Sequence, residues 1–331
     1  METVTEEATL AEAYQAAHEG AIVVDRSDLG VLKFTGETRL DLLQRMSTED
    51  VSSLRSGEGA ATILTTDIGR MIDRLLLYAS SDAVYALTGE DNADAVARYL
   101  MRFVFFQDDF HIEDLSAQTA VFGVYGPEAG ARLHSLFGDG MSSDGQQLAL
   151  HQWRQLSTGG TTVYVHRTDG VAGDGYFVMC DAQEADSVWQ RLLDAGIVPV
   201  DGEAFDYLRI ESGLPRFGRE ISEAYIPLEA GLWSDVSFSK GCYIGQEIIA
   251  RMESRGRLAK QLVRLRGEAP VAAGADVEAG GRAVGTITSA GNGPAGPLAL
   301  GYVKTRALGE DGDVELSAGG VSLQIVEAVR R

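Results

Sequence analysis

Apolar residues at the start of the chain come in short runs that turn residues separate. Between residues 20 and 36 these runs predict short strands. Over residues 37–46 the spacing changes, so that Leu40, Leu43 and Met46 fall on one face of a helix. The pattern therefore predicts strands followed by an amphipathic helix.

A hairpin is expected next. Residues 61–65 and 71–79 are apolar runs on either side of the turn Thr66-Asp67-Ile68-Gly69, which is typical of two paired strands. Residues 83–88 predict a third strand and residues 93–103 a helix.

The same order of elements recurs later in the chain. Residues 161–195 predict two strands, joined by a turn at Asp169-Gly170, and a helix over 184–195. We interpret 60–103 and 161–195 as a weak internal pseudo-repeat of an α+β unit. The interpretation depends on element order, because the residues themselves barely match.

Further elements are expected outside the repeat. Residues 120–125 predict a strand, and Pro127 is placed in the first turn of the next helix, where its missing N–H costs nothing. Residues 201–212 predict another helix. After about Gly256, short apolar runs broken by glycine predict five strands, at 261–266, 283–288, 299–303, 314–317 and 322–326. This texture favours a separate C-terminal β-barrel or sandwich over 256–331.

The composition is that of an acidic globular protein of more than one domain. The chain has 331 residues, 45% of them hydrophobic, which is enough for a sizeable core. Acids outnumber bases by 49 to 28, so the formal net charge is -21. Only four of the bases are lysines, and such a surface suits a halophilic protein, because salt screens its self-repulsion. The charge argues against nucleic acid as a partner.

Several other classes are disfavoured. No basic region with an apolar run opens the chain, and no stretch approaches 18 apolar residues, so neither secretion nor a membrane span is expected. The two cysteines, Cys180 and Cys242, form no CxxC pair, and the five histidines have no ligand spacing. We therefore expect a cytoplasmic protein without a metal site.

The densest chemical signal is Lys240-Gly-Cys-Tyr-Ile-Gly-Gln-Glu-Ile-Ile-Ala-Arg251. A lysine precedes Cys242, and a helix is expected to begin at about Gly245, so positive charge and free helix N–H groups favour a thiolate. From the residues alone a second interpretation stays open, in which Cys242 is a small buried apolar residue. We adopt that interpretation for Cys180, which lies in an apolar run.

The run KGCYIGQE resembles the signature of YgfZ-type proteins, a branch of the superfamily that includes the glycine-cleavage T-protein and other folate-dependent enzymes. The resemblance covers nearly the whole chain. Further similar segments are Asp25-Arg-Ser-Asp-Leu29, Phe34 to Leu54, Tyr125-Gly-Pro-Glu-Ala129, Leu208-Arg-Ile-Glu-Ser-Gly-Leu-Pro215, Pro227-Leu-Glu-Ala-Gly-Leu232 and Gly285-Thr-Ile-Thr-Ser289.

The resemblance implies an α+β fold of the aminomethyltransferase type. It would be a cloverleaf of three subdomains, with two interleaved α+β subdomains over 1–250 and a C-terminal β-barrel over 256–331. The resemblance also implies that tetrahydrofolate, or its 5-formyl or 5,10-methylene derivative, binds in a central opening.

Carboxylates would hold the pterin, because its edge presents adjacent N–H donors. Asp174 is one candidate, and Glu211 with Arg209 is another. Candidates for further folate contacts are Tyr243, Gln246, Glu247 and Arg251. For each acid taken singly, an ordinary surface ion pair is the competing interpretation.

A local excess of bases also favours an anionic ligand. Residues 209–266 hold ten bases and seven acids in a chain that is otherwise strongly acidic. The glutamate tail of a folate would be drawn to such a segment. The bases could equally bridge neighbouring acids.

Two departures from the family pattern bear on activity. Transferases of the family usually carry Thr-Gly-Glu where this chain has Ala172-Gly173-Asp174. They also carry paired acids after the hairpin turn, where this chain has Asp73 followed by Arg74. The segment that would hold the pterin is therefore altered, and one of the two paired acids is replaced by an arginine.

Two functions follow from the resemblance. In the first, the protein binds tetrahydrofolate and supports iron–sulfur cluster assembly or repair through Cys242, aided by Lys240, with iron–sulfur proteins or assembly factors as partners. In the second, it is a folate-dependent aminomethyltransferase or methyltransferase that uses Asp73. The KGCYIGQE run favours the first function.

Overall fold

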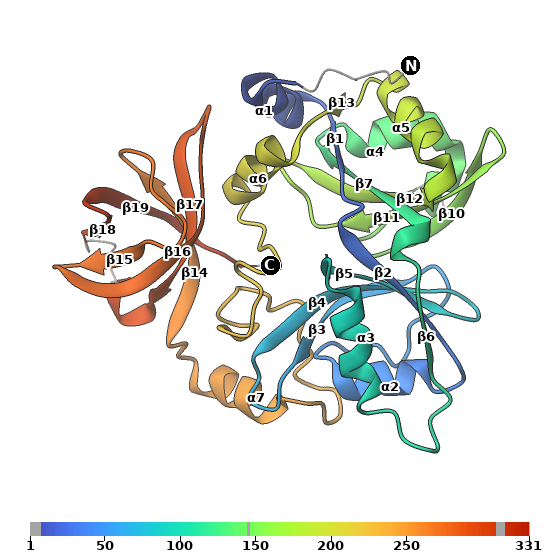
Figure 1. Cartoon of the computed structure of the whole chain (residues 1–331), viewed down its shortest axis with the longest axis horizontal. Coiled ribbons are helices and arrows are strands. Elements are labelled where there is room, and N and C mark those ends of the chain that lie inside the picture. Colours follow the sequence, from blue (N-terminus) through green and yellow to red (C-terminus); the bar gives the residue numbers. More distant parts are fainter. Residues whose placement is uncertain (1–7, 144–145, 309–314, 331) are drawn as a thin grey trace. The chain divides into compact units, whose positions relative to one another are not determined.

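The computed structural model describes residues 8–143, 146–308 and 315–330. The chain divides into two compact units (Figure 1). The first unit comprises Met1–Asp28 and Leu115–Ser212, and the second comprises Leu29–Asp114 and Gly213–Arg331. The chain thus leaves the first unit after Asp28, returns at Leu115, and leaves it again after Ser212. The domain limits expected at 250 and 256 stay a prediction.

A six-stranded sheet forms the centre of the first unit, in the order β10-β11-β12-β7-β1-β13. Its neighbouring strands are antiparallel, except that β1 and β13 are parallel. The strands are β1 (Ile22–Asp25), β7 (Thr119–Gly126), β10 (Trp153–Thr158), β11 (Thr161–Thr168), β12 (Asp174–Asp181) and β13 (Val198–Pro199). A separate short ladder pairs β8 (Ser142–Ser143) with β9 (Gln146–Gln147).

Helices α4 (Ala129–Phe137) and α5 (Ala185–Asp194) pack against this sheet. Leu133 and Leu192 from the two helices share one apolar core with Val163 and Val178 of the sheet, because alternate strand residues point to the same face. Helices α1 (Leu10–Glu19) and α6 (Gly202–Glu211) complete the unit. Short 3₁₀ turns occur at η1 (Ser116–Gln118), η2 (Gly138–Met141) and η3 (Ala182–Glu184).

The second unit begins with a five-stranded sheet in the order β3-β4-β5-β2-β6. Helices α2 (Arg39–Met46) and α3 (Ala93–Met101) pack on it, and their apolar residues share a core with the strands. The strands are β2 (Leu29–Thr35), β3 (Gly59–Thr65), β4 (Met71–Ala79), β5 (Val84–Glu90) and β6 (His111–Asp114). The expected hairpin is confirmed, since β3 and β4 pair and the Thr66 N–H donates to the Arg70 carbonyl across the turn.

The two sheets share an order of elements. In the second unit it is β2-α2-β3-β4-β5-α3, and in the first it is β7-α4-β10-β11-β12-α5 with the short ladder β8–β9 inserted after α4. In each sheet the last strand of the three-stranded meander pairs with the strand before the first helix. The sequence pattern had shown only part of this likeness, because β10 was not predicted as a strand.

The second unit continues through α7 (Gln246–Arg255) into a closed six-stranded barrel, β14-β17-β16-β15-β18-β19. The strands are β14 (Lys260–Gly267), β15 (Asp276–Ala279), β16 (Arg282–Gly293), β17 (Gly296–Lys304), β18 (Leu316–Ala318) and β19 (Val321–Ala328), with the 3₁₀ turn η4 (Thr305–Ala307). A barrel was therefore correctly predicted, but β15 was missed because it is short and carries two acids among its four residues.

Two further predictions differ from the structure or fall outside it. Pro127 precedes Glu128, the N-cap residue of α4, so it does not lie in the first helical turn. The restricted φ of proline is compatible with either position. Val314, the first residue of an expected strand, lies outside the described residues.

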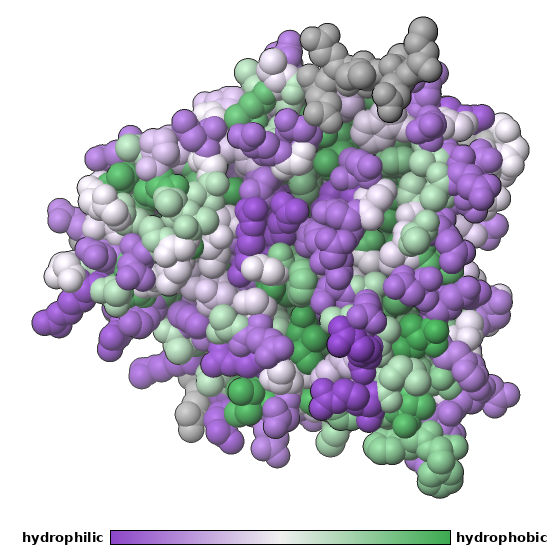
Figure 2. Space-filling model, in the orientation of Figure 1, coloured by the Kyte–Doolittle hydropathy of each residue, from purple (hydrophilic) through white to green (hydrophobic). Residues whose placement is uncertain are grey.

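The described surface is largely hydrophilic on the face shown in Figure 2, with small apolar patches between polar areas. Within the described residues, no helix is long and apolar enough to cross a membrane. Likewise, in the part of the chain that the structure describes, no cluster of three or more His, Cys, Asp or Glu could hold a metal ion.

Candidate functional site

Lys240, at the start of the KGCYIGQE run, is buried in the second unit and anchors the loop that carries Cys242. Its Nζ donates to three backbone carbonyls, those of Gln44 at 2.8 Å, Ser47 at 2.8 Å and Glu49 at 2.7 Å. Burial lowers the pKa of Lys240 to about 8, although Asp50 and Glu49 act in the opposite direction. An ammonium has three N–H donors, and all three are engaged here.

The lysine therefore stabilises the loop against the C-terminal end of α2, where the free carbonyls of a helix favour a positive charge. Its charge is not presented to solvent. The prediction that Lys240 assists Cys242 stays untested, but the contacts describe an anchoring role for it.

The opposite side of the loop is held by hydrogen bonds to Ile244. Its N–H donates to the Arg45 carbonyl at 3.3 Å, and its own carbonyl accepts from the Thr65 hydroxyl at 2.6 Å. Cys242 lies between these anchors and is exposed. The buried interpretation of Cys242 is therefore wrong, since the loop is held at both ends while the thiol faces solvent.

Gly245 allows the loop to lie against the β3–β4 turn. It has a φ of 85° and forms the N-cap of α7. A Cβ at this position would come within 2.6 Å of the Thr66 carbonyl oxygen and 2.7 Å of the Thr65 hydroxyl. Only glycine meets both demands, the left-handed φ and the close backbone approach.

The second cysteine has a different environment. Cys180 on β12 is buried in the core of the first unit, and burial raises the pKa of its thiol to about 11. The structural interpretation of Cys180 is confirmed. Among the described residues the protein thus has one accessible thiol, at Cys242.

Asp73 on β4 has no exposed surface. Its carboxylate accepts hydrogen bonds from the Arg74 N–H at 2.8 Å, the Gly89 N–H at 2.9 Å and the Asn92 amide at 2.9 Å. Burial raises the pKa of Asp73 to about 6, and the three donors act against this rise. The carboxyl group can change charge near neutral pH, but it does not contact solvent in this structure.

Arg74 forms a buried ion pair with Asp235. Its Nε donates to Asp235 Oδ2 at 2.5 Å, and its Nη2 lies 3.4 Å from Oδ1. The Asp235 carbonyl also accepts from the Thr48 hydroxyl. Sequence reasoning missed Asp235. An arginine on a buried strand requires an acid partner, and that requirement was the signal that could have led to it.

The motif residues after Cys242 separate into buried and accessible ones. Tyr243 packs in a small core with Ile249, and burial raises the pKa of its phenol to about 12. Gln246 is partly exposed, and Glu247 and Arg251 are exposed on α7. These three accessible side chains can meet a ligand from solvent, whereas Tyr243 serves the core.

The remaining candidates belong to the first unit. Asp174 pairs through Oδ1 with Arg167 Nη2 at 2.6 Å, and its side chain is 30% exposed. Arg167 also lies over the Tyr176 ring, 5.0 Å from its centroid. The second oxygen of Asp174 is therefore the one that a pterin edge could use.

Glu211 on α6 contacts two residues of α1. One of its oxygens accepts from the Tyr14 hydroxyl at 2.9 Å, and the other lies 3.1 Å from His18 Nε2. Arg209 is buried and donates to Asp206 at 2.8 Å. The prediction that Glu211 and Arg209 contact the pterin stays untested.

The basic segment 209–266 is partly neutralised by internal contacts. Five of its bases have acid or carbonyl partners, namely Arg209, Arg216, Lys240, Lys260 and Arg264. Four others are exposed, namely Arg219, Arg251, Arg257 and Arg266. The contacts support the bridging interpretation for some of these bases, and the attraction of an anionic ligand stays a prediction.

Comparison with known proteins covers both parts of the sequence. The family model "GCVT N-terminal domain" matches residues 2–240, and the model "CAF17, C-terminal beta-barrel domain" matches residues 260–328.

Two relatives illustrate the similarity. A chloroplastic protein of Arabidopsis thaliana, named as a candidate transferase, is 32% identical over 299 residues, which cover 89% of this chain and 68% of the relative. An aminomethyltransferase of Symbiobacterium thermophilum is 29% identical over 329 residues, 96% of this chain and 88% of the relative.

A solved structure shares the fold. The glycine cleavage system aminomethyltransferase T from Bartonella henselae aligns with a TM-score of 0.82 at 22% identity, over 97% of this chain and 88% of its own. The α+β fold class with a C-terminal barrel, expected from the motifs, is confirmed.

Proposed function

The chain belongs to the aminomethyltransferase family defined by the GCVT N-terminal domain and carries the CAF17-type barrel, and from this premise we propose that it binds tetrahydrofolate and supports iron–sulfur cluster assembly or repair through Cys242. The observation that carries the proposal is the exposed thiol on a loop held at both ends. A reactive group needs both access and a fixed position. We place the protein in the cytoplasm, where a free thiol stays reduced.

The folate part of the proposal is supported by acceptor geometry. A pterin edge with adjacent N–H donors needs carboxylate oxygens that are accessible and not fully engaged. Asp174 fits this need through its second oxygen, while both oxygens of Glu211 already have partners. Arg251, exposed in the cysteine motif, is the candidate for the anionic tail. When bound, tetrahydrofolate supplies ring nitrogens that carry one-carbon units.

A titration tests folate binding. Calorimetry with 5-formyltetrahydrofolate should give a dissociation constant in the micromolar range, about -8 kcal/mol of binding free energy. The variant Asp174→Asn should weaken binding, because it removes the charge that the pterin pairs with, and Glu211→Gln should weaken it less. A titration without saturable heat at millimolar ligand would refute this part of the proposal.

A paired experiment tests the thiol. In cells that lack the native protein, Cys242→Ala should accumulate normally but fail to restore the activity of an iron–sulfur enzyme. Cys180→Ala is the matched control, because it removes the buried thiol and should still complement when it folds. Full complementation by Cys242→Ala would contradict the proposal.

Labelling separates access from function. Iodoacetamide should modify Cys242 in the folded protein well before Cys180, which is buried and has a raised pKa. Bound folate should slow the reaction if Cys242 acts beside the ligand. If both thiols are labelled equally, and only after the protein unfolds, the proposed role of Cys242 is contradicted.

Transfer of a one-carbon group to the folate is the second candidate function. It is favoured by the relatives named aminomethyltransferase and by the retained Asp73. The burial of Asp73 and the Arg74–Asp235 pair weigh against direct proton exchange with a ligand. An assay with aminomethylated carrier protein decides the matter, and turnover that Asp73→Asn abolishes would reverse our ranking.

A further inference from the structure

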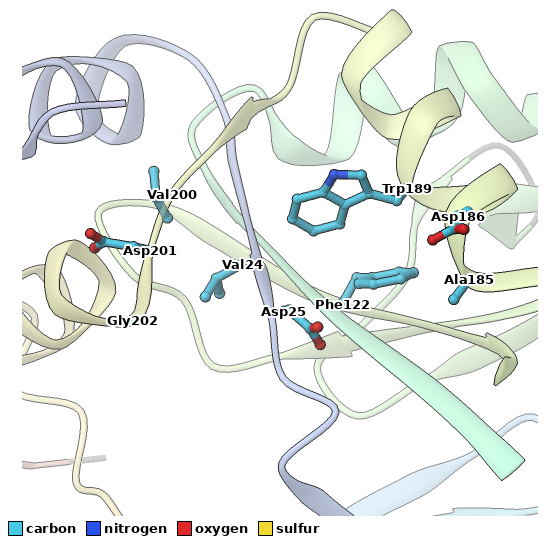
Figure 3. Close-up of a pocket in the computed structure, with 9 residues that line it drawn as sticks. All are labelled: Val24, Asp25, Phe122, Ala185, Asp186, Trp189, Val200, Asp201 and Gly202. Carbon is cyan, nitrogen blue, oxygen red and sulfur yellow. The ribbon is translucent and has the colours of Figure 1, made fainter. Parts of the chain in front are cut away.

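A cavity of about 350 Å³ lies in the first unit (Figure 3). Its walls come from the end of β1, the middle of β7, the first turns of α5 and the residues that lead into α6. A volume of this size is within the range of small-ligand sites. The cavity is not part of the proposed folate or thiol chemistry.

Two aromatic rings form one side of the cavity. The indole of Trp189 on α5 and the ring of Phe122 on β7 have centroids 5.2 Å apart and are tilted by 54°. Phe122 is buried and Trp189 is partly buried. Val24 of β1 adds an aliphatic surface beside them. Ring faces of this kind attract a cation through their quadrupole, and they accept its methyl groups.

Carboxylates surround the rings. In the view of Figure 3, the Asp25 and Asp186 carboxylates lie to either side of the Phe122 ring, while that of Asp201 points toward the start of α6. The last arrangement fits the Asp201 side chain, which accepts from the Ala204 N–H as the N-cap of α6. Asp25 accepts one hydrogen bond through Oδ1, from the Ser27 N–H.

The cavity has no compensating positive charge on its walls. Among the described residues that line it, none is Lys, Arg or His. The neighbouring Arg26 lies over the Phe205 ring, 5.2 Å from its centroid, and pairs with Asp28. Asp25 and Asp186 are exposed, so their charges act from the rim, while the rings lie deeper.

We propose that this cavity binds a methylated ammonium group, with its methyl groups against Trp189 and Phe122 and its charge balanced by Asp25 and Asp186. A primary ammonium would need hydrogen-bond acceptors on every side, which the ring faces do not supply. A methylated ammonium has no N–H groups to satisfy, or few, and is weakly hydrated. The chemistry of the walls therefore selects the methylated cation.

Ligand titrations with the full chain test the proposal. Saturation-transfer NMR at constant ionic strength should show saturable binding of choline, with its methyl resonance shifted upfield by the rings. The neutral isostere 3,3-dimethylbutan-1-ol and the primary amine ethanolamine should each bind at least about fivefold more weakly, since about 1 kcal/mol of cation–π attraction is lost. Choline binding should weaken as salt rises, because the rim charges are screened.

Three variants localise the binding. Trp189→Leu and Asp186→Asn should each weaken choline binding, through loss of the ring face and of the rim charge. Asp194→Asn is the matched control, because it removes an exposed charge from the same helix outside the cavity and should leave binding unchanged. If Trp189→Leu does not fold, Asp186→Asn still tests the site, since its side chain is exposed.

Two results would overturn the inference. One is equal affinity for choline and its neutral isostere, which would make the cavity merely apolar. The other is unchanged choline binding in both Trp189→Leu and Asp186→Asn. The outcome does not depend on the proposed folate function, because no residue of that site takes part.

Discussion

The guanidinium of Arg74 lies against the carboxylate of Asp235, and the two side chains are only 11% and 1% exposed. The family resemblance implies a second acid at this position, and the structure shows that the arginine is the partner of a buried carboxylate. A buried charge without its partner is costly, so neither residue can be removed alone without loss of stability.

We therefore expect Arg74→Met to lower the free energy of unfolding by about 3 to 5 kcal/mol, because it leaves Asp235 charged and unpaired. Urea denaturation measures the change. Arg98→Met is the control, since Arg98 pairs with Asp94 on an exposed face of α3 and should have no measurable effect. Similar losses of unfolding free energy for both variants would contradict a large contribution of the buried ion pair to stability.

A second prediction concerns the glycines of the cysteine motif. Gly245→Ala should lower stability by about 1 kcal/mol or more, because it places a Cβ against Thr66 at a left-handed φ. Gly241→Ala is a matched control, since a Cβ there would meet no heavy atom within 4 Å. Thermal unfolding compares the two variants. An equal loss for both would argue against the close contact of Gly245 with the β3–β4 turn.

Asp73 should make stability depend on pH. Its pKa is about 6 in the folded protein and near the ordinary value of 3.8 when unfolded, so the folded state holds the proton more tightly. The stabilisation is complete below about pH 4 and is lost as the pH rises through about 6, and it amounts to about 3 kcal/mol.

Urea denaturation between about pH 4 and pH 7 measures this dependence, and Asp73→Asn should remove its share of it. The stability curve of the variant is subtracted from that of the native protein, because burial also raises the pKa of Glu49 and Glu229. These two groups change the stability with pH in the same direction as Asp73. Parallel curves for the native protein and Asp73→Asn would contradict the raised pKa.

Salt should stabilise the protein. With 49 acids and 28 bases, net repulsion in the folded state is large, and molar KCl screens it. The melting temperature should therefore rise from low to molar salt, and sodium sulfate should be compared with KCl at equal ionic strength to separate screening from surface exclusion. A melting temperature that does not change with KCl would refute the halophilic interpretation.

Local sequence determined much of the fold. The apolar periods of residues 37–46 and 71–79, and the turn between β3 and β4, place a helix and a hairpin where the structure has them. Such elements depend on neighbours close in the chain, so a pattern of spacing and turn residues is enough to predict them. The family motifs likewise led to the barrel and to Cys242.

Only the tertiary structure decided what each motif residue contacts. Lys240 meets carbonyls almost 200 positions earlier, Arg74 meets Asp235 across 161 positions, and Glu211 meets Tyr14 across 197 positions. Partners so distant in sequence are brought together by packing, and an acid or a base has no local pattern that names its partner. The sequence therefore determined that charges must be paired in the core, whereas the fold decided which pairs form, because burial and distance arise only when the elements pack.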